Sequence, residues 1–548
     1  MPICLKKMKQ NRLLTLLLVL FVVLLSLPYL VPRMGVLALV AFIPLLCAER
    51  IATISGKKRF FWWYFTAFLA FNLATTWWVC KATVGGGLFA SFYSTLFMSA
   101  IFAIFRASRR RFRGIVPYIL LAVSWIAWER FNLTYAQLSW PWLILGNAFG
   151  RSVSLVQWYE ITGALGGSLW VWLSNIAIFS LLVSLSDGRW WRWNLKARGA
   201  AIAATVLVTI GPIVASEIRY ATYEERSDAG TLDVVLAQSN FDPWHKLHYT
   251  PQAEQNAQVI GLFEKHLRSR ENSDSLLLML IPESFSSDIW MNDPATAPTW
   301  RSFSTLAASQ ANANLIFGAS THESFGTAAP PSLLARRLRD GSWYHSYNTA
   351  FITDGRGYSD HRNKCKLVVG AESTPYPKVF APIDDMLGGL MGRCVPDAHA
   401  RCFELRGRGA DDRRLRTGVA ICYESIYPEL CKEFVDDGAQ MLSVITNDGW
   451  WGDTPGYRQH FSFSRLRAIE LRRDVARCAN TGISGFINQR GDVVCQSGWW
   501  VPDVLESKVN LSSHKTFFAT YGDIVGRVCT FVCLMLLLML IVRSITKK

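Results

Sequence analysis

Hydrophobic residues follow two patterns along this chain. Residues 1–220 and 523–548 contain long, nearly uninterrupted apolar runs, whereas residues 225–513 contain short apolar runs separated by polar and amphipathic stretches. An apolar run of about 20 residues can cross the hydrocarbon core of a bilayer as a helix. The long runs therefore predict eight membrane spans, seven before the central region and one after it. The predicted spans are 13–32, 34–48, 60–80, 86–105, 115–133, 168–186, 199–217 and 527–543.

The central region has the pattern of an α/β domain. Its short runs are apolar nearly throughout, as in strands that are buried on both faces of a sheet. The predicted strands are 232–237, 276–281, 314–319, 347–353, 417–422, 441–446 and 485–488, and helical patterns lie at 251–268, 299–311, 428–437 and 457–479. We therefore expect a polytopic membrane bundle at 1–220, an α/β domain at 225–513, and a last span with its tail at 523–548.

A long loop is predicted at 373–408. It holds several prolines and the adjacent pair Gly388 and Gly389. Loops of this length are commonly lids or binding elements. Because apolar residues such as Met386 and Leu390 are mixed with charged ones, one hypothesis is that this loop enters the surface of a bilayer.

Composition and charge agree with a membrane protein. Of 548 residues, 51% are hydrophobic and 22 are tryptophan, and the mean hydropathy is positive. The net charge of +16 needs no nucleic-acid partner, because basic residues cluster at alternate ends of the predicted spans, as they do in cytoplasmic loops. Both termini are then cytoplasmic, and the central domain faces the outside, which is the periplasm if the cell is Gram-negative. The clusters are Lys6/Lys7/Lys9/Arg12, Arg50/Lys57/Lys58/Arg59, Arg106/Arg109/Arg110/Arg111/Arg113, Arg189/Arg192/Lys196/Arg198 and Arg543/Lys547/Lys548.

The cysteines and histidines give no sign of a metal centre. The central region contains no C-x-x-C pair, and none of the nine histidines belongs to an H-E-x-x-H motif. We therefore expect no metal and no cofactor. An oxidising compartment would permit disulfides, and Cys394 with Cys402 is the first pair to test, although sequence alone cannot assign connectivity.

Three residues at the ends of predicted strands could carry covalent acyl transfer: Glu283, Lys364 and Cys422. A thiol must lose its proton to attack, so a neighbouring cation is expected to lower its pKa and a carboxylate to take the proton. The ammonium would also stabilise the oxyanion of a tetrahedral intermediate. No histidine except His361 lies near these positions in the sequence, which makes a Cys–His pair less convincing than this trio.

The trio belongs to a series of ordered motifs that resembles the nitrilase superfamily. With eight spans around it, the domain resembles the apolipoprotein N-acyltransferase family, whose members complete the maturation of bacterial lipoproteins. This resemblance implies an α-β-β-α sandwich for the central domain. The motifs are Gln238-x-Asn240, Pro282-Glu283, Lys364-x-x-Leu-Val, Gly418-Val-Ala-Ile-Cys-Tyr-Glu424, Thr446-Asn-Asp-Gly-Trp450-Trp-Gly, Arg467-Ala-Ile-Glu-Leu471 and Ala479-Asn-Thr-Gly482.

The resemblance also implies roles for individual residues. Cys422 corresponds to the nucleophile, Glu283 to the general base and Lys364 to the group that stabilises the transition state, while Glu372 matches a second active-site carboxylate. Other residues that match family positions needed for activity or positioning are Asn348, Tyr423, Glu424, Asn447, Trp450, Glu470 and, through the segment after Asn240, Trp244. One segment departs from the family, because residues 367–372 read Leu-Val-Val-Gly-Ala-Glu in place of the common Leu-Val-Pro-Phe-Gly-Glu.

The reaction implied by the resemblance has two halves. Cys422 takes an acyl chain from a membrane phospholipid as a thioester, and the N-terminal amine of a diacylglyceryl apolipoprotein then accepts it. Both substrates stay in the membrane, because each methylene of their acyl chains that is buried in lipid contributes about 0.8 kcal/mol to the free energy of membrane binding. We expect the protein to act as a monomer.

Simpler interpretations of these residues remain open at this stage. Cys422 could be a core residue, Glu283 a capping residue and Lys364 a solvated base, and Cys365 is a rival nucleophile of lower rank. Glu372, Glu424 and Glu470 could be structural carboxylates, while Asn348, Asn447 and Trp450 could shape loops or pocket walls. Two other functions are a membrane-tethered amidase of the nitrilase type and a transport or scaffold protein that only binds a ligand.

Overall fold

The computed structural model describes residues 2–246, 250–268, 275–407 and 414–546 and divides into two compact units. Arg408, Lys547 and Lys548 of the segments named above lie outside the described residues. The first unit comprises Met1–Ala136, Trp140–Tyr223 and Tyr521–Lys548, and the second comprises Gln137–Ser139 and Glu224–Thr520. The short segment Gln137–Ser139 thus belongs to the second unit although it lies between two helices of the first in sequence.

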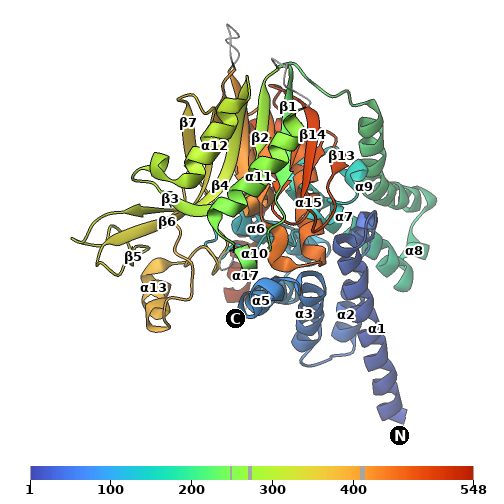
Figure 1. Ribbon diagram of the computed structural model, residues 1–548. Helices are drawn as coiled ribbons and strands as arrows, with labels where there is room; N and C mark the ends of the chain where they lie inside the picture. The colour runs from blue at the N-terminus through green and yellow to red at the C-terminus, as the bar shows by residue number, and fades with distance from the viewer. Residues whose placement is uncertain (1, 247–249, 269–274, 408–413, 547–548) are drawn as a thin grey trace. The chain divides into compact units, whose positions relative to one another are not determined.

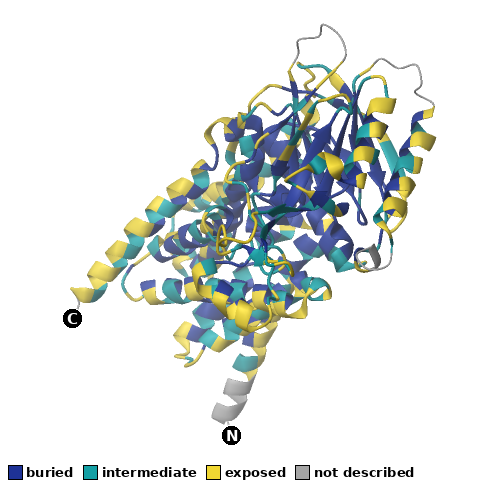
Figure 2. Cartoon of the chain, turned by 60° about the vertical axis from the view of Figure 1, so that its left-hand side comes forward, coloured by how far each residue is buried: buried dark blue, intermediate teal, exposed yellow. Residues whose placement is uncertain are grey.

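The first unit is helical. Its long helices are apolar on most faces, and α17, the last of them, exposes much of its surface, as expected of a helix that contacts lipid (Figure 2). The helices are α1 (Pro2–Leu30), η1 (Gly35–Leu39), α2 (Ile43–Ile54), α3 (Phe61–Thr76), α4 (Val79–Ala82), α5 (Val84–Ser108), α6 (Val116–Thr134), η2 (Leu145–Phe149), η3 (Val153–Val156), α7 (Tyr159–Ser186), α8 (Arg189–Arg192), α9 (Leu195–Thr222) and α17 (Ile524–Ile545).

Six helical segments among the described residues are long and apolar enough to cross a membrane, fewer than the eight spans expected. They are Lys9–Leu30, Gly35–Ile54, Val84–Ser108, Tyr159–Ser186, Leu195–Thr222 and Ile524–Ile545. The other two expected spans, 60–80 and 115–133, fall on α3 and α6, which are helices of 16 and 19 residues. The expected span 168–186 begins earlier than predicted, at Tyr159, and turns at Gly163, whose φ of 64° suits a residue without a side chain.

The second unit is an α/β domain with two sheets. The first sheet has the order β14-β1-β2-β4-β6-β5, with β3 paired to β4 and β7 to β6, and the second has the order β13-β12-β11-β10-β9-β8. The first sheet is formed by β1 (Thr231–Gln238), β2 (Leu277–Leu280), β3 (Ser286–Trp290), β4 (Ala313–Ser324), β5 (Arg336–Arg337), β6 (Trp343–Thr353), β7 (Ser359–Asn363) and β14 (Asp503–Asn510). The second is formed by β8 (Phe403–Leu405), β9 (Leu415–Ile421), β10 (Met441–Thr446), β11 (Val475–Ala479), β12 (Gly485–Ile487) and β13 (Val493–Gln496).

The two sheets pack face to face through alternate residues of their central strands. Val234 of β1 and Ile316 of β4 share one buried cluster with Ile421 of β9 and Ile445 of β10. The residues that point the other way from the first sheet pack against the helices α11 (Gln252–Leu267) and α12 (Pro298–Ser309), which lie over its outer face in Figure 1. The helices α14 (Pro428–Asp436) and α15 (Pro455–Leu471) contact the second sheet. Figure 2 shows the strands almost wholly buried between these layers.

Two sequence predictions need correction. The helix expected at 457–479 ends at Leu471, where Arg472 adopts a left-handed φ of 47°, and residues 475–479 form the buried strand β11 instead. The loop expected at 373–408 contains the helix α13 (Pro377–Met386), whose Pro377 lies in the first turn, where a missing N–H costs no hydrogen bond. Its Met386, Leu387 and Leu390 are strongly exposed, as the mixed composition indicated.

Candidate active site

Cys422 lies at the point where the buried strand β9 ends and the short 3₁₀ helix η6 (Cys422–Ile426) begins. β9 lies next to the edge strand β8 of the second sheet and pairs on its other side with β10 in parallel. Cys422 has φ 52°, an unusual backbone conformation for a residue with a side chain. Such a turn has to be held in place by its surroundings.

Glu424 holds this turn against the segment that carries Lys364. Its Oε2 accepts hydrogen bonds from the Ile421 N–H at 2.7 Å and from Arg362 Nη1 at 2.8 Å. Its Oε1 accepts from Arg362 Nη2 at 2.7 Å and from the Cys365 N–H at 2.6 Å. Burial alone would raise the pKa of Glu424, but Arg362 and the backbone donors lower it. A fully buried, ionised carboxylate with four donors is a structural clamp, which favours the positioning role over proton transfer.

Lys364 is the centre of a buried cluster that also contains Glu283, Glu372 and Asn348. Its Nζ donates to Glu283 Oε1 at 2.8 Å and to Glu372 Oε1 at 3.0 Å. Asn348 Nδ2 donates to the same two oxygens at 2.8 and 2.7 Å. The second oxygen of Glu283 accepts from the Asn447 N–H at 3.1 Å, and that of Glu372 from the Val368 N–H at 2.7 Å. We refer to these four residues as the carboxylate–lysine cluster.

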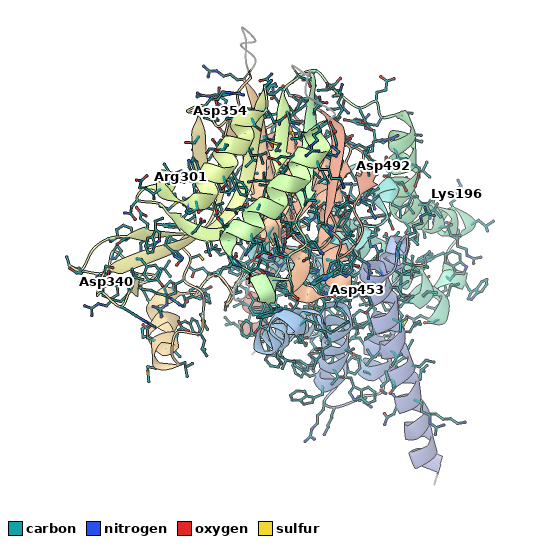
Figure 3. The ribbon with its side chains drawn as sticks, viewed as in Figure 1. Lys196, Arg301, Asp340, Asp354, Asp453 and Asp492 are labelled. Atoms are coloured by element: carbon teal, nitrogen blue, oxygen red, sulfur yellow. The ribbon has the colours of Figure 1, made fainter. Side chains whose placement is uncertain are left out.

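Backbone packing explains why Glu283 reaches this cluster. Glu283 follows β2, and the backbone of β4 runs so close to it that a Cβ on Gly318 would lie 2.6 Å from the Glu283 Cα. Only glycine permits this approach without displacement of one strand. Glu283 and Lys364 are buried and Glu372 is half-buried, in contrast to the exposed Arg301 and Asp340 at the surface of the same unit (Figure 3).

The electrostatics of Lys364 and Cys422 are coupled. Burial alone would lower the pKa of Lys364, but Glu283, Glu372 and Cys422 together raise it well above its ordinary value. Burial and Glu283 raise the pKa of Cys422, while Lys364 lowers it, and the net direction is upward. The sequence had suggested that a cation would lower the pKa of the thiol. Lys364 does act in that direction, but desolvation and the carboxylate outweigh it, so the resting thiol is protonated.

Tyr423, Trp244, Trp450 and Glu470, which match other family positions, make contacts of their own. Tyr423 Oη donates to the Ser139 carbonyl at 3.0 Å, and Trp244 packs edge-on against Trp450 with 5.0 Å between ring centroids. Glu470 lies outside the carboxylate–lysine cluster. It pairs with Arg467 at 2.6 Å, and Arg467 donates to the Ile426 carbonyl at the end of η6, which makes Glu470 a structural carboxylate behind the turn.

Sequence reasoning missed a second buried polar group beneath Cys422, formed by His460, Asp448 and Arg477. His460 Nε2 lies 3.1 Å from the Cys422 carbonyl oxygen and 3.1 Å from Ser425 Oγ. A carbonyl only accepts, so Nε2 carries the proton. Burial and Arg477 lower the pKa of His460, which favours its neutral form, and its Nδ1 lies 2.9 Å from both Arg477 Nη2 and Asp448 Oδ1. The sequence feature that could have revealed this group was the position of His460 inside a predicted helix whose other face is apolar.

This polar group does not fit a metal ion. Ligand atoms of Cys422, Asp448 and His460 lie within 4.8 Å of one another. However, the Arg477 guanidinium already lies 2.7 Å from Asp448 Oδ2 and 2.9 Å from His460 Nδ1. A fixed cation at both potential ligands would repel a metal.

Cys365 is a weaker candidate than Cys422, because the two charged groups that act most on it, Glu424 and Arg362, already bond to each other. Burial and Glu424 raise the pKa of Cys365 to about 12, and Arg362 Nη2 lies 3.2 Å from its sulfur. Cys394 and Cys402, the pair suggested for a disulfide, are both free thiols.

Comparison with known proteins finds matches over both units. The family model described as the N-terminal domain of apolipoprotein N-acyltransferase matches residues 22–177, and the carbon-nitrogen hydrolase model matches residues 251–517. A protein of Chlorobaculum tepidum named apolipoprotein N-acyltransferase is 27% identical over 514 residues, which cover 93% of this chain and 92% of the relative. Proteins of the same name from Geobacter metallireducens and Pasteurella multocida are each 25% identical, over 92% and 88% of this chain and 91% and 87% of their own.

Proposed function

Because the chain belongs to the apolipoprotein N-acyltransferase family, we propose that it moves an acyl chain from a membrane phospholipid to the N-terminal amine of a diacylglyceryl apolipoprotein. One observation carries the site assignment: Lys364 donates to both Glu283 and Glu372, and the charges of Glu283 and Lys364 act directly on the Cys422 thiol. A base, a cation and a nucleophile are the minimum set for acyl transfer through a thioester.

In the first half-reaction, Glu283 takes the proton of the Cys422 thiol as sulfur attacks the ester carbonyl of the phospholipid. The carbonyl oxygen gains negative charge, which the Lys364 ammonium stabilises. When the carbon–oxygen bond breaks, Glu283 returns its proton to the leaving alkoxide. A lysophospholipid leaves, and the acyl chain stays on Cys422 as a thioester.

In the second half-reaction, the amine of the acceptor attacks the thioester. Glu283 takes a proton from the attacking nitrogen, the carbon–sulfur bond breaks, and the thiolate that leaves recovers a proton from Glu283. A resting thiol with a raised pKa suits this sequence, since the sulfur is ionised only while a substrate carbonyl is present.

Ion pairs within the first unit support a topology of eight spans. Arg109, at the end of α5, pairs with Glu49 of α2, and Arg50 of α2 pairs with Asp187, at the end of α7. The ends of α2, α5 and α7 therefore meet at one face of this unit. A chain can return to the same face only if α3 crosses between α2 and α5, and α6 between α5 and α7.

The basic clusters at these same ends support a cytoplasmic location for this face and for both termini. The second unit, which follows the seventh span, would then be periplasmic. We also propose that the protein acts as a monomer, because each residue of the carboxylate–lysine cluster comes from one chain.

The test is intact-protein mass spectrometry of the full-length protein after exposure to phospholipid without acceptor. We expect an adduct of one acyl chain on the wild type and on Cys365→Ser, and none on Cys422→Ala. Addition of a diacylglyceryl peptide should remove the adduct and yield the N-acylated peptide. An adduct on Cys422→Ala would refute the assignment of the nucleophile, and discharge by water at the same rate with or without the peptide would favour the amidase.

A further inference from the structure

The first unit contains a basic cavity that the proposed reaction does not use. Its volume is about 520 Å³, and it lies where the ends of α2, α5 and α7 meet the start of α6. All of its lining residues belong to the first unit. Those that matter most are the arginines Arg50, Arg109, Arg113 and Arg189 and the apolar residues Phe112 and Phe179.

Positive charge exceeds negative charge around this cavity. Glu49 is shared by Arg106 and Arg109, and Asp187 by Arg50 and Arg189. Two carboxylates thus serve four arginines. Arg113 lines the cavity as well and has no carboxylate partner among the described residues. Glu49 is 3% exposed, so its ion pairs fix the positions of Arg106 and Arg109.

The cavity wall is also amphipathic. Phe112, Ile115, Phe179 and Val183 form apolar parts of the lining beside the arginines. The Phe112 ring is held by Arg543 of α17, whose guanidinium lies 5.0 Å from the ring centroid. A free inorganic anion needs only the basic part, whereas a phospholipid offers a phosphate to the arginines and its glycerol and first methylenes to the apolar residues.

We propose that this cavity binds the phosphodiester headgroup of an anionic phospholipid. Guanidinium groups match the geometry of phosphate oxygens with two parallel donors, and basic cavities between membrane helices are suited to acidic headgroups. A zwitterionic lipid carries its own ammonium, which the excess of arginine would repel. The bound lipid would bridge the ends of α2, α5 and α7 at a site distinct from the carboxylate–lysine cluster.

The test uses the full-length protein in detergent and native mass spectrometry with ether-linked phosphatidylglycerol or phosphatidylethanolamine, neither of which can acylate Cys422. We expect the wild type to retain phosphatidylglycerol preferentially. Arg113→Gln with Arg189→Gln should reduce this retention by about tenfold. The matched control is Arg110→Gln with Arg192→Gln, which removes the same charge from the same two segments but changes no residue that lines the cavity.

Several outcomes would overturn the proposal. Equal loss of phosphatidylglycerol from both double variants would indicate diffuse surface charge, and equal retention of the two lipids by the wild type would exclude selection of an acidic headgroup. Displacement of phosphatidylglycerol by inorganic phosphate at equal concentration would show that a free anion suffices. If the double variant loses helix content, the single substitution Arg113→Gln serves instead, because it breaks no ion pair among the described residues; it should still lower the retention of phosphatidylglycerol, and unchanged retention would contradict the proposal. A failure of acyl transfer would leave these outcomes unchanged.

Discussion

At the scale of single residues, the two carboxylates that share Lys364 are not equivalent. Both accept hydrogen bonds from Lys364 and Asn348, but the charge of Glu283 raises the pKa of the Cys422 thiol, whereas that of Glu372 acts on Lys364. Glu283 is also the more buried, with 7% of its side chain exposed against 19% for Glu372. These differences support the proposal that Glu283 is the base and that Glu372 holds Lys364 in position.

We therefore predict unequal effects of two matched substitutions. Glu283→Gln should slow formation of the acyl-enzyme by about 10²- to 10⁴-fold, because no group remains to take the thiol proton. Glu372→Gln should slow it far less, since Lys364 keeps its ion pair with Glu283. Single-turnover release of lysophospholipid measures both rates. A larger loss in Glu372→Gln than in Glu283→Gln would reverse the two assignments.

His460 leads to a second prediction at this scale. Its Nε2–H donates to the carbonyl of Cys422, whose backbone is in an unfavourable conformation, so loss of this donor should disorder the nucleophile. We expect His460→Ala to slow acyl-enzyme formation by at least about tenfold and His460→Gln, which can still donate, to slow it less. Because burial keeps His460 neutral, the pH profile of the wild type should show no step near pH 6.5. Such a step, absent in His460→Gln, would contradict the positioning role.

The sequence predicted the proximity of Glu283, Lys364 and Cys422 better than the residues that surround them. Glu283, Lys364 and Cys422 each follow a strand, so their meeting at one edge of the sheets could be expected. The bonds of Glu424 to Arg362 join residues 62 positions apart in the sequence, and nothing in the local pattern distinguishes this pair from surface charges. The same applies to Arg477, which lies in a strand otherwise apolar and was assigned to a helix.

At the scale of elements, apolar runs predicted most of the strands that are buried on both faces of a sheet. β9 and β10 agree with the predicted runs because they are buried on both faces. β14 was missed because it lies at the edge of its sheet, where its residues are mostly half-buried or exposed and several are charged. β11 was missed because it follows α15 after only three residues, without the glycine or proline that would have marked a boundary.

Asp474 joins the two sheets, and its ionisation leads to a prediction about the pH dependence of stability. It precedes β11, its carbonyl accepts from the Leu442 N–H of β10 at 3.0 Å, and its Oδ2 accepts from the Asn510 N–H of β14 at 2.8 Å. Burial raises the pKa of this carboxyl to about 7. Between its unfolded value near 4 and this value, the folded protein holds a proton that the unfolded chain has lost, so stability falls as pH rises through that window.

Asp474→Asn cannot titrate and should remove this dependence. The variant should gain stability over the wild type at pH 8 but not at pH 4, by a few kcal/mol at most, since each pKa unit corresponds to about 1.4 kcal/mol. Thermal unfolding of the second unit across this pH range measures the difference, and the exposed Asp453→Asn serves as the control. Parallel pH curves for wild type and Asp474→Asn would show that the carboxyl is already ionised in the folded state.

At the scale of the whole molecule, the number of spans decides which face each loop occupies. Apolarity identifies six spans, whereas the proposed topology of eight spans, which the ion pairs of Arg109 with Glu49 and of Arg50 with Asp187 support, has α3 and α6 cross as well. Sequence hydropathy suggested eight spans, but it could not distinguish a short crossing helix from a packed helix that stays on one side. The polar residues Glu129 and Asn132 reduce the apolarity of α6. Both accept hydrogen bonds from the segment that follows this helix.

Reporter fusions can distinguish these two topologies, but only at certain loops. With either six or eight spans, both ends of the chain and the loop at 187–188 lie on one side of the membrane, and the second unit lies on the other. The side on which residues 109–115 lie depends on the topology. With eight spans they follow four crossings and lie on the side of the N-terminus, whereas with six spans they follow three crossings and lie on the opposite side. We predict that green fluorescent protein fused after Phe112 fluoresces, as it does in the cytoplasm, and that alkaline phosphatase fused there is inactive. Alkaline phosphatase fused after Thr83 should be active, because an odd number of spans then precedes it. The reverse result at both positions would indicate that α3 and α6 do not cross the membrane. The arginines of the basic cavity would then lie on opposite sides of it.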